Sequence, residues 1–285
     1  MTPAAEDDEV TLESDAFERN VKTPKVRWDD DVPDPEASTY PLAEPGPEPI
    51  PGWVITEAAA RQHDLGVLKT GKEAEVVVIE RTLGDRSTRL AAKRYRDLTR
   101  RSFRNDARYR EPRATGDTRA DRAMTKGTRK GQAFRAQMWA EAEFTTLCRL
   151  WEAGVAVPYP VQLLGTEVVL ELLGDDEQAA PRLADVKARH CDMPDLAQQA
   201  VTALRLMTAA GIVHADLSPY NTLVWEAKLY VIDVPQAMDI TSSDGAALLR
   251  RDVDNLLGWM AAKGGKVDPD AVYAELMATV LHGPR

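Results

Sequence analysis

Three side chains that carry oxygen atoms stand at short, fixed distances in one stretch of this 285-residue sequence. Asn221 lies five residues after Asp216, and Asp233 lies twelve residues after Asn221. An apolar helical pattern precedes the stretch, and two short β-prone runs, residues 222–225 and 228–232, lie within it. The sequence therefore predicts a loop between a helix and two short strands, with the polar side chains on or beside it. This feature restricts the choice of fold most.

The types and order of these residues suit phosphoryl transfer. That reaction needs a carboxylate near the attacking group and further oxygen ligands for the magnesium ions on ATP. In Ile212–Asn221, which reads IVHADLSPYN, Asp216 would orient or deprotonate the nucleophile. Asn221 and Asp233 would hold the metal, and His214 would support the loop rather than carry a proton. The alternative is an ordinary helix-to-strand turn, because Asp, Ser, Pro and Asn are common in turns.

A lysine and a glutamate upstream could complete such a site. A kinase needs a lysine on a small-lobe strand, paired with a glutamate on a helix. Lys93, in LAAKRY, fits the first role. Glu143 fits the second, because Leu147 and Leu150 follow it at helical spacing. Glu141 lies about 200° away around the same helix, so it would face elsewhere.

The segment Gly66–Lys72, GVLKTGK, matches the GxxxxGK pattern of a Walker A phosphate loop. However, Glu73 comes next, where a Walker loop has the Ser or Thr that binds magnesium, and a strand rather than a helix follows. The sequence instead favours a turn between two strands that covers the ATP phosphates. The residues expected at its tip are Thr70, Gly71, Lys72 and Glu73.

Composition limits the class of protein. Apolar residues make up 44% of the chain, enough to fill a core, and the net charge of -10 argues against a surface that coats nucleic acid. The two cysteines, Cys148 and Cys191, are far apart and predict reduced thiols rather than a disulfide framework. The acidic N-terminus has no apolar signal segment, and no apolar run approaches the roughly 18 residues that span a bilayer. We therefore expect a soluble, cytoplasmic protein with no membrane partner.

Changes in composition divide the chain into parts. Residues 1–50 hold fourteen Asp or Glu, four Lys or Arg and eight Pro, which predicts a disordered acidic tail. Residues 51–172 are expected to form a small β-rich lobe, and residues 173–285 a reduced, mostly helical lobe with the catalytic and metal-binding loops. Residues 94–135 hold fourteen Arg or Lys against five Asp or Glu, so we expect a flexible basic insertion at about 96–132.

The order of the predicted elements favours an α+β fold with two lobes, as in protein kinases. The expected strands are residues 74–80, 88–95, 161–164, 167–173, 222–225 and 228–232. The expected helices are residues 54–65, 134–152, 195–210, 246–263 and 268–281.

Six blocks of sequence, in this order, resemble those of the RIO kinases and are most similar to the first RIO subgroup. They are TGKEAEV, LAAKRY, WAEAEF, VVLELLG, HADLSPYN and IDVPQ. The resemblance runs from about Gly66 to Arg250–Asn255, RRDVDN, and so covers most of the expected folded chain. Each block alone is short, but their common order and spacing make the resemblance specific.

The resemblance implies an ATP-dependent serine/threonine protein kinase that uses magnesium or manganese and phosphorylates its own serine residues. It also implies an ATPase-like cycle through a phosphorylated aspartate, which would be Asp233 here. It places the hinge beside the nucleotide at Glu171 and Leu172. Members of this family act in maturation of the small ribosomal subunit, so that subunit or its rRNA is an expected partner, reached through the basic insertion.

The sequence departs from the family pattern at Pro219, where a glutamate is common, and in its acidic tail. Only 52 residues follow Asp233, and they contain no APE-like sequence. We therefore do not expect a broad platform for protein substrates.

Two other functions stay open. Small-molecule phosphotransferases that resemble aminoglycoside or choline kinases share the H-x-D-x-x-x-x-N loop and the metal-binding aspartate. The TGKEAEV block and the basic insertion disfavour this reading. The other is an ATP-gated, non-enzymatic factor that binds ribosomal RNA, which the basic insertion suggests.

Overall fold

The computed structural model describes residues 36–96, 129–175, 178–187 and 191–282. Most of the expected acidic tail, and residues 97–128 of the expected basic insertion, lie outside these ranges. Within the described ranges, no helix combines the length and the apolar character needed to cross a membrane.

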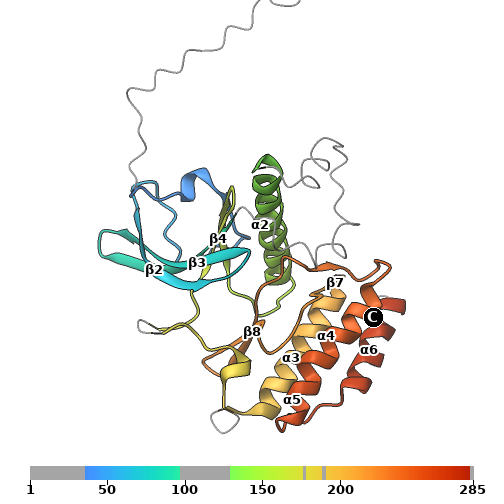
Figure 1. The fold of residues 1–285 in the computed structure, drawn as a ribbon. Coiled ribbons are helices and arrows are strands. Elements are labelled where there is room, and N and C mark those ends of the chain that lie inside the picture. Colours follow the sequence, from blue (N-terminus) through green and yellow to red (C-terminus); the bar gives the residue numbers. More distant parts are fainter. Residues whose placement is uncertain (1–35, 97–128, 176–177, 188–190, 283–285) are drawn as a thin grey trace, which may run out of the picture. The chain divides into compact units, whose positions relative to one another are not determined.

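An antiparallel sheet of six strands forms the small lobe, in the order β1-β5-β6-β4-β3-β2 (Figure 1). Its strands are β1 (Glu44–Pro45), β2 (Arg61–Thr70), β3 (Ala74–Leu83), β4 (Arg86–Tyr95), β5 (Pro160–Leu164) and β6 (Glu167–Glu171). The β-branched run in β3 favours extended backbone. Gly84, with a φ of 57°, permits the tight turn into β4.

Helix α2 (Arg129–Glu152) covers part of one face of this sheet. Tyr95 and Val168 of the sheet pack there against Ala140 and Phe144 of the helix. Apolar residues that recur every three to four positions give a helix one buried stripe, and this stripe fixes which side of α2 faces the sheet. The helix therefore brings its inward side chains over the C-terminal end of β4.

Residues 36–60 form a strap that contacts both edges of the sheet. At one edge, the Gln62 N–H of β2 donates to the Glu36 carbonyl (2.7 Å). At the other edge, the Gly46 N–H donates to the Val161 carbonyl of β5 (3.0 Å). A Cβ on residue 46 would lie 1.8 Å from the Pro160 carbonyl oxygen, so this approach requires glycine.

The strap also encloses an arginine on the outer face of the sheet. Arg81 is fully buried. Its guanidinium donates to the Ile55 carbonyl (3.1 Å) and to the Oε1 atoms of Gln62 and Gln162 (both 2.7 Å), and it lies 5.5 Å from the ring centroid of Tyr40. Burial lowers the pKa of Arg81 to about 10. Because two of these partners, Tyr40 and Ile55, come from the strap, the strap is needed to satisfy the buried cation.

The strap corrects two expectations. Residues 36–50 belong to the folded unit, so the disordered tail predicted for residues 1–50 is wrong over this part. The helix predicted at residues 54–65 is also wrong, because residues 61–70 form β2. Backbone pairing at a sheet edge cannot be recognised from a proline-rich, polar sequence. An exposed edge strand also lacks the alternation of apolar and polar residues that marks a strand in sequence.

Helices dominate the large lobe (Figure 1). They are α3 (Met193–Ala209), α4 (Gly245–Val253), α5 (Trp259–Ala262) and α6 (Pro269–His282), with a π-helical segment, η6 (Asp254–Gly258), between α4 and α5. Two small antiparallel sheets pair β7 (Ile212–Val213) with β10 (Met238–Asp239), and β8 (Thr222–Trp225) with β9 (Lys228–Val231), the second pair as a hairpin. The α+β, two-lobed fold class predicted from the sequence is confirmed.

Helix α3 sets where the loop after it begins. The Asp192 side chain accepts from the Asp195 N–H at its start (3.1 Å), as an N-cap residue does. Gly211, with a φ of 75°, turns the chain just beyond its last residue. The stretch after Gly211 therefore begins at a fixed point, and it leads to Asp216 and Asn221.

Candidate active site

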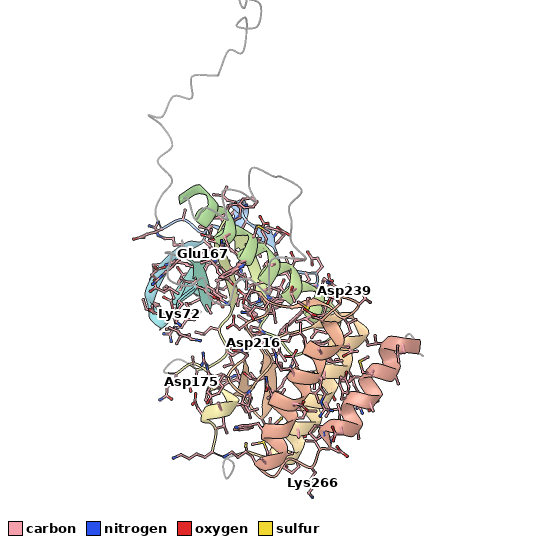
Figure 2. The ribbon with its side chains drawn as sticks, turned by 45° about the vertical axis from the view of Figure 1, so that its right-hand side comes forward. Lys72, Glu167, Asp175, Asp216, Asp239 and Lys266 are labelled. Atoms are coloured by element: carbon pink, nitrogen blue, oxygen red, sulfur yellow. The ribbon has the colours of Figure 1, made fainter. Side chains whose placement is uncertain are left out.

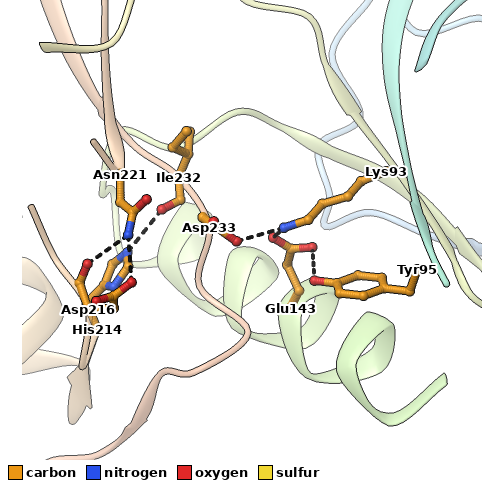
Figure 3. A network of polar contacts seen from close by, with 8 residues as sticks. All are labelled: Lys93, Tyr95, Glu143, His214, Asp216, Asn221, Ile232 and Asp233. Atoms are coloured by element: carbon orange, nitrogen blue, oxygen red, sulfur yellow. Dashed lines mark hydrogen bonds and ion pairs between the residues drawn. The ribbon is translucent and has the colours of Figure 1, made fainter. Parts of the chain in front are cut away.

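The Lys93 ammonium group joins the two lobes. Its Nζ atom lies 2.5 Å from Glu143 Oε1 and 2.8 Å from Asp233 Oδ1 (Figure 3). Lys93 comes from β4 and Glu143 from α2, whereas Asp233 follows β9 in the large lobe. The structure thus brings together three residues that stand 50 and 90 positions apart in the chain.

The charges of this cluster depend on one another. Burial alone would lower the pKa of Lys93, but the Glu143 and Asp233 carboxylates outweigh it and raise that pKa. Burial would raise the pKa of Asp233, yet the adjacent ammonium holds it below its usual value. Burial raises the pKa of Glu143, and Lys93 offsets only part of that rise. At neutral pH, Lys93 therefore stays protonated and positively charged, and Asp233 stays ionised and negatively charged.

Asp216 and Asn221 form a second group at the end of the loop. The Asn221 amide nitrogen donates to the backbone carbonyl of Asp216 (2.8 Å) and to its Oδ2 atom (3.0 Å). The amide nitrogen is thereby committed to Asp216, so the Asn221 Oδ1 atom is turned away from that residue. The five-residue spacing in the sequence therefore corresponds to a loop that the Asn221 side chain closes by its hydrogen bonds to Asp216.

Backbone and ring contacts connect this loop to Asp233. The Ile232 N–H donates to the Asn221 carbonyl (3.0 Å), and the Ile232 carbonyl lies 3.0 Å from His214 Nε2. Because a carbonyl oxygen only accepts, His214 carries its proton on Nε2. His214 is buried, and among the described residues its Nδ1 atom has no partner. These contacts agree with the supporting role expected for His214.

Two residues of α4 form hydrogen bonds to the backbone of the loop and hold it in place. Asp252 is buried, and its two carboxylate oxygens accept from the N–H groups of Ala215 (2.8 Å) and Leu217 (2.9 Å). The Arg251 guanidinium donates to the Ala215 carbonyl. Ala215 has a φ of 67°, a left-handed conformation that is costly for a residue with a side chain. Bonds to both its N–H and its carbonyl hold it there.

The available oxygen atoms suit a magnesium ion. Asp233 uses Oδ1 for Lys93, which leaves Oδ2 for a ligand, and Asn221 offers Oδ1. Magnesium prefers hard oxygen ligands and is commonly held by one or two protein groups together with substrate phosphates. Within the described part of the chain, no cluster of three or more His, Cys, Asp or Glu could hold a metal by itself. The residues therefore fit an ion that arrives with a nucleotide.

The predicted phosphate turn lies between β2 and β3. Thr70 is the last residue of β2, and the Gly71 N–H donates to the Ala74 carbonyl (2.8 Å), which closes the turn around Lys72 and Glu73. A strand follows this turn, so the Walker A reading is excluded and the two-strand turn of the sequence prediction is the structure found.

An apolar row on the sheet lies next to the lysine. Val78 is paired with Ala91, and Ala91 with Leu170, across three neighbouring strands. Directly paired residues point to the same side of a sheet. Lys93 lies two positions along β4 from Ala91, so it points to this side as well. The sheet face beside the ion-pair cluster therefore offers an apolar surface, which suits a purine base. Next to it lies the Lys93 cation, which suits a phosphate chain.

The expected hinge follows this row, at the end of β6. The Glu171 carboxylate accepts from the Tyr159 N–H (3.0 Å), and the Glu171 N–H donates to the Tyr159 carbonyl (2.9 Å). Leu172 comes directly after the strand and is half-buried. The Glu171 carboxylate is thus engaged by Tyr159. In this segment, the groups that remain for hydrogen bonds to a nucleotide base are those of the backbone.

Comparison with known proteins identifies the family. A family model described as RIO domain matches residues 77–272, more than half of the chain. The chain belongs to the RIO family. This RIO chain is 35% identical over 209 residues to the RIO-type serine/threonine-protein kinase Rio1 of Haloferax volcanii, a match that covers 73% of this chain and 67% of that protein.

Two eukaryotic relatives match in the same way. The probable serine/threonine-protein kinase RIO1 homolog of Encephalitozoon cuniculi is 34% identical over 182 residues, which cover 63% of this chain and 44% of the relative. The serine/threonine-protein kinase RIO1 of Caenorhabditis elegans is 33% identical over 192 residues, which cover 67% and 36%. The match thus spans less than half of either eukaryotic protein. The predicted family is confirmed, and it favours a protein kinase over a small-molecule phosphotransferase.

Several residues of the RIO site escape sequence reasoning. The Tyr95 hydroxyl donates to Glu143 Oε2 (2.7 Å), and Asp252 holds the loop as described above. Lys69 lies close enough to Lys93 and Asp233 to interact with their charges. Tyr95 follows Lys93 by two positions, which on a strand means the same side, so alternation could have revealed it. Asp252 lies in the RRDVDN block, but its partners cannot be read from that block.

Proposed function

We propose that this RIO chain binds ATP with magnesium between its two lobes and transfers the γ-phosphoryl group to a serine hydroxyl, on itself or on another protein. The observation that carries the proposal is the position of the Lys93 ammonium between Glu143 and Asp233. Glu143 fixes the lysine from the small lobe, and Asp233 meets it from the large lobe. A cation and a metal-binding carboxylate so placed can engage the same triphosphate.

Each residue then has a defined task. The Lys93 ammonium donates to phosphate oxygens, and Asn221 and Asp233 hold the ion, which when bound neutralises charge on the phosphates. The Asp216 carboxylate orients the serine hydroxyl and accepts its proton. The serine oxygen forms a bond to the γ-phosphorus while the bond from that phosphorus to the β–γ bridging oxygen breaks. ADP leaves with the electron pair of the broken bond.

We also propose that Asp233 can accept the phosphoryl group itself. Its carboxylate is ionised, because the adjacent ammonium keeps the pKa of Asp233 below its usual value. Attack of a carboxylate oxygen on the γ-phosphorus would give an aspartyl phosphate and ADP. Water would then cleave the aspartyl phosphate to release inorganic phosphate and restore Asp233. The net reaction of this branch is ATP hydrolysis.

Transfer of label from [γ-³²P]ATP tests both branches. We expect Asp216→Asn to slow labelling of serine by about 10²- to 10⁴-fold, the usual effect of losing a positioned base. Asp233→Asn should abolish label that hydroxylamine removes, since hydroxylamine cleaves an acyl phosphate but not a serine phosphate. Lys266→Gln, at the far end of the large lobe (Figure 2), is the control and should label as wild type. Wild-type labelling in the Asp216 variant would reject the role of that residue.

We propose the small ribosomal subunit or its rRNA as the partner of the basic insertion. The support is the sequence: fourteen Arg or Lys against five Asp or Glu in residues 94–135, which run from the end of β4 into the first turns of α2. Binding through such a segment releases counterions, so it should weaken steeply as salt rises. Co-sedimentation with purified small subunits at low and high salt tests this. Binding that is absent, or that does not change with salt, would reject it.

A further inference from the structure

The path of strand β2 determines where Lys69 points. Val67 is paired with Val77, and Lys69 with Val76, so Leu68 is an extra residue in β2 at this point. Val77 belongs to the outer apolar face of the sheet. Without the extra residue, Lys69 would point to that outer face as Val67 does. The bulge therefore turns Lys69 to the opposite side.

That opposite side is the one that carries Lys93. Val76, the partner of Lys69, is itself paired with Lys93 on β4. Lys69, Val76 and Lys93 thus form one row across three strands, and directly paired residues point the same way. The two lysines are separated by two strand spacings, about 10 Å. Lys69 is exposed and stands at the open edge of the sheet.

Arg182, in the large lobe, lies close enough to Lys69 for the two charges to interact. Its backbone forms an isolated antiparallel bridge with Leu223 of β8. Thr222 and Val231 of this hairpin are buried in the core of the lobe. Leu223, one position along from Thr222, therefore points away from the core, and Arg182 beside it does so as well. Arg182 is half-buried at this position.

The two cations carry like charges and have no carboxylate partner. Partial desolvation lowers the pKa of Lys69, and Arg182 is the charge that lowers it most, ahead of Lys93, while Asp233 acts in the opposite sense. Within the ranges that the structure describes, neither Lys69 nor Arg182 forms an ion pair. The exposed Arg86 and Arg96 of the same lobe, by contrast, each have a carboxylate partner.

We propose that Lys69 and Arg182 form a clamp, one cation from each lobe, that holds the phosphate chain of a nucleotide. The clamp rests on the proposed ATP site and extends it. A chain of phosphates placed between the two cations would replace their repulsion with two attractive contacts. A nucleoside without phosphates would gain nothing from them. The clamp therefore makes affinity depend on the phosphate chain, and it draws the lobes together when that chain is present.

Nucleotide binding by the full chain tests the clamp. Dissociation constants for ATP, ADP and adenosine would be measured by calorimetry for wild type, Lys69→Gln, Arg182→Gln and the double variant, with magnesium present. We expect each single variant to bind ATP about tenfold more weakly, the usual effect of losing one charged contact, and the double variant about a hundredfold. ADP should lose less, and adenosine should bind each protein within about twofold of wild type. Lys266→Gln should match wild type for all three ligands.

A second measurement separates the clamp from a structural role. If the two cations repel in the empty protein, Lys69→Gln should melt no lower than wild type without nucleotide, but ATP should raise its melting temperature less. Equal losses for ATP and adenosine, or a lower melting temperature without nucleotide, would overturn the clamp. So would unchanged ATP binding in both single variants. Failure of the wild type to bind either ATP or adenosine would instead overturn the nucleotide site, and the clamp with it.

Discussion

At the scale of single residues, the least expected element of the site is a carboxylate that contacts backbone. Asp252 uses both oxygen atoms on the amides of Ala215 and Leu217, on either side of Asp216. It is therefore a positioning residue, because it acts on the loop rather than on a substrate. Its own sequence neighbours give no sign of this, since the contact joins residues about 36 positions apart.

We predict that Asp252→Asn lowers the free energy of unfolding by about 2–3 kcal/mol and slows phosphoryl transfer. An asparagine has one acceptor oxygen, so its NH₂ group would face one of the two backbone N–H groups. Chemical denaturation and the [γ-³²P]ATP assay would measure the two effects. Asp254→Asn, an exposed change two residues further along, should alter stability by less than about 0.5 kcal/mol. Equal losses in both variants would contradict the prediction.

Tyr95 gives a second prediction at this scale. Burial raises the pKa of Tyr95 well above its usual value, so the hydroxyl stays a donor to Glu143 across the working pH range. Tyr95→Phe removes a hydrogen bond to a buried carboxylate and should cost about 2 kcal/mol of unfolding free energy. Tyr273→Phe, which removes a 3.3 Å contact from a half-buried hydroxyl to a carbonyl, should cost under about 1 kcal/mol. Thermal and urea unfolding would compare them, and the reverse order would disprove the argument.

At the scale of elements, strand β2 shows what sequence patterns miss. The strands β3 and β4 could be predicted within a few residues, because their β-branched and apolar runs are bounded by turn residues. β2 is exposed along almost its whole length and contains two register shifts, so it has no regular alternation. Its existence depends on pairing with β3, and the direction of Lys69 depends on the bulge. Neither can be derived from residue types alone.

Arg94 fastens this edge strand to the sheet. From β4 it donates to both oxygens of Asp64 in β2 (2.6 and 2.8 Å) and to Glu167 in β6 (2.6 Å). Lysine cannot reproduce this fork. We predict that Arg94→Lys lowers the unfolding free energy by about 1 kcal/mol, since the network is half exposed. Arg86→Lys, which affects a single contact to Glu57, should have a smaller effect in the same urea titration.

The same contact sets a pH dependence. The Arg94 hydrogen bonds hold the pKa of Asp64 below its usual value. The stabilisation is therefore complete above the unfolded pKa of about 4, and it is lost as pH falls through the lower folded pKa. The difference in stability between wild type and Arg94→Lys should thus be constant from neutral pH to about pH 5 and shrink at lower pH. A difference that grows as pH falls would contradict this assignment.

At the scale of the whole molecule, one ion-pair cluster connects the lobes at the point where substrate would bind. Sequence reasoning could select Lys93, Glu143 and Asp233, which contact one another, and Asp216 with Asn221, which form a second pair, because each stands in a short block with a defined chemical need. It could not show that the Lys93 ammonium contacts Asp233, because that contact depends on how the lobes pack. Nor could it place residues 36–50, whose contacts are specific to the folded sheet.

We predict that magnesium–ATP stabilises the wild type by about 2.7 kcal/mol at a concentration one hundred times its dissociation constant. Lys93→Met should lose this effect. Without nucleotide, the same variant should be less stable than wild type by about 3 kcal/mol, because Glu143 and Asp233 lose the ammonium that they share. Calorimetric melting with and without nucleotide would show both changes. A variant as stable as wild type would mean that the cluster does not hold the lobes.

The strap over Arg81 bears on how this protein can be shortened. The family match begins at residue 77, inside β3, and every catalytic side chain proposed above lies within it. A gene trimmed to that match, or to Pro51 where the composition changes, would still encode the full set of reacting groups. It would also leave a guanidinium stranded in an apolar layer without Tyr40 above it. A segment can therefore contain every reacting group and still be too short to fold and act, because it lacks the strap.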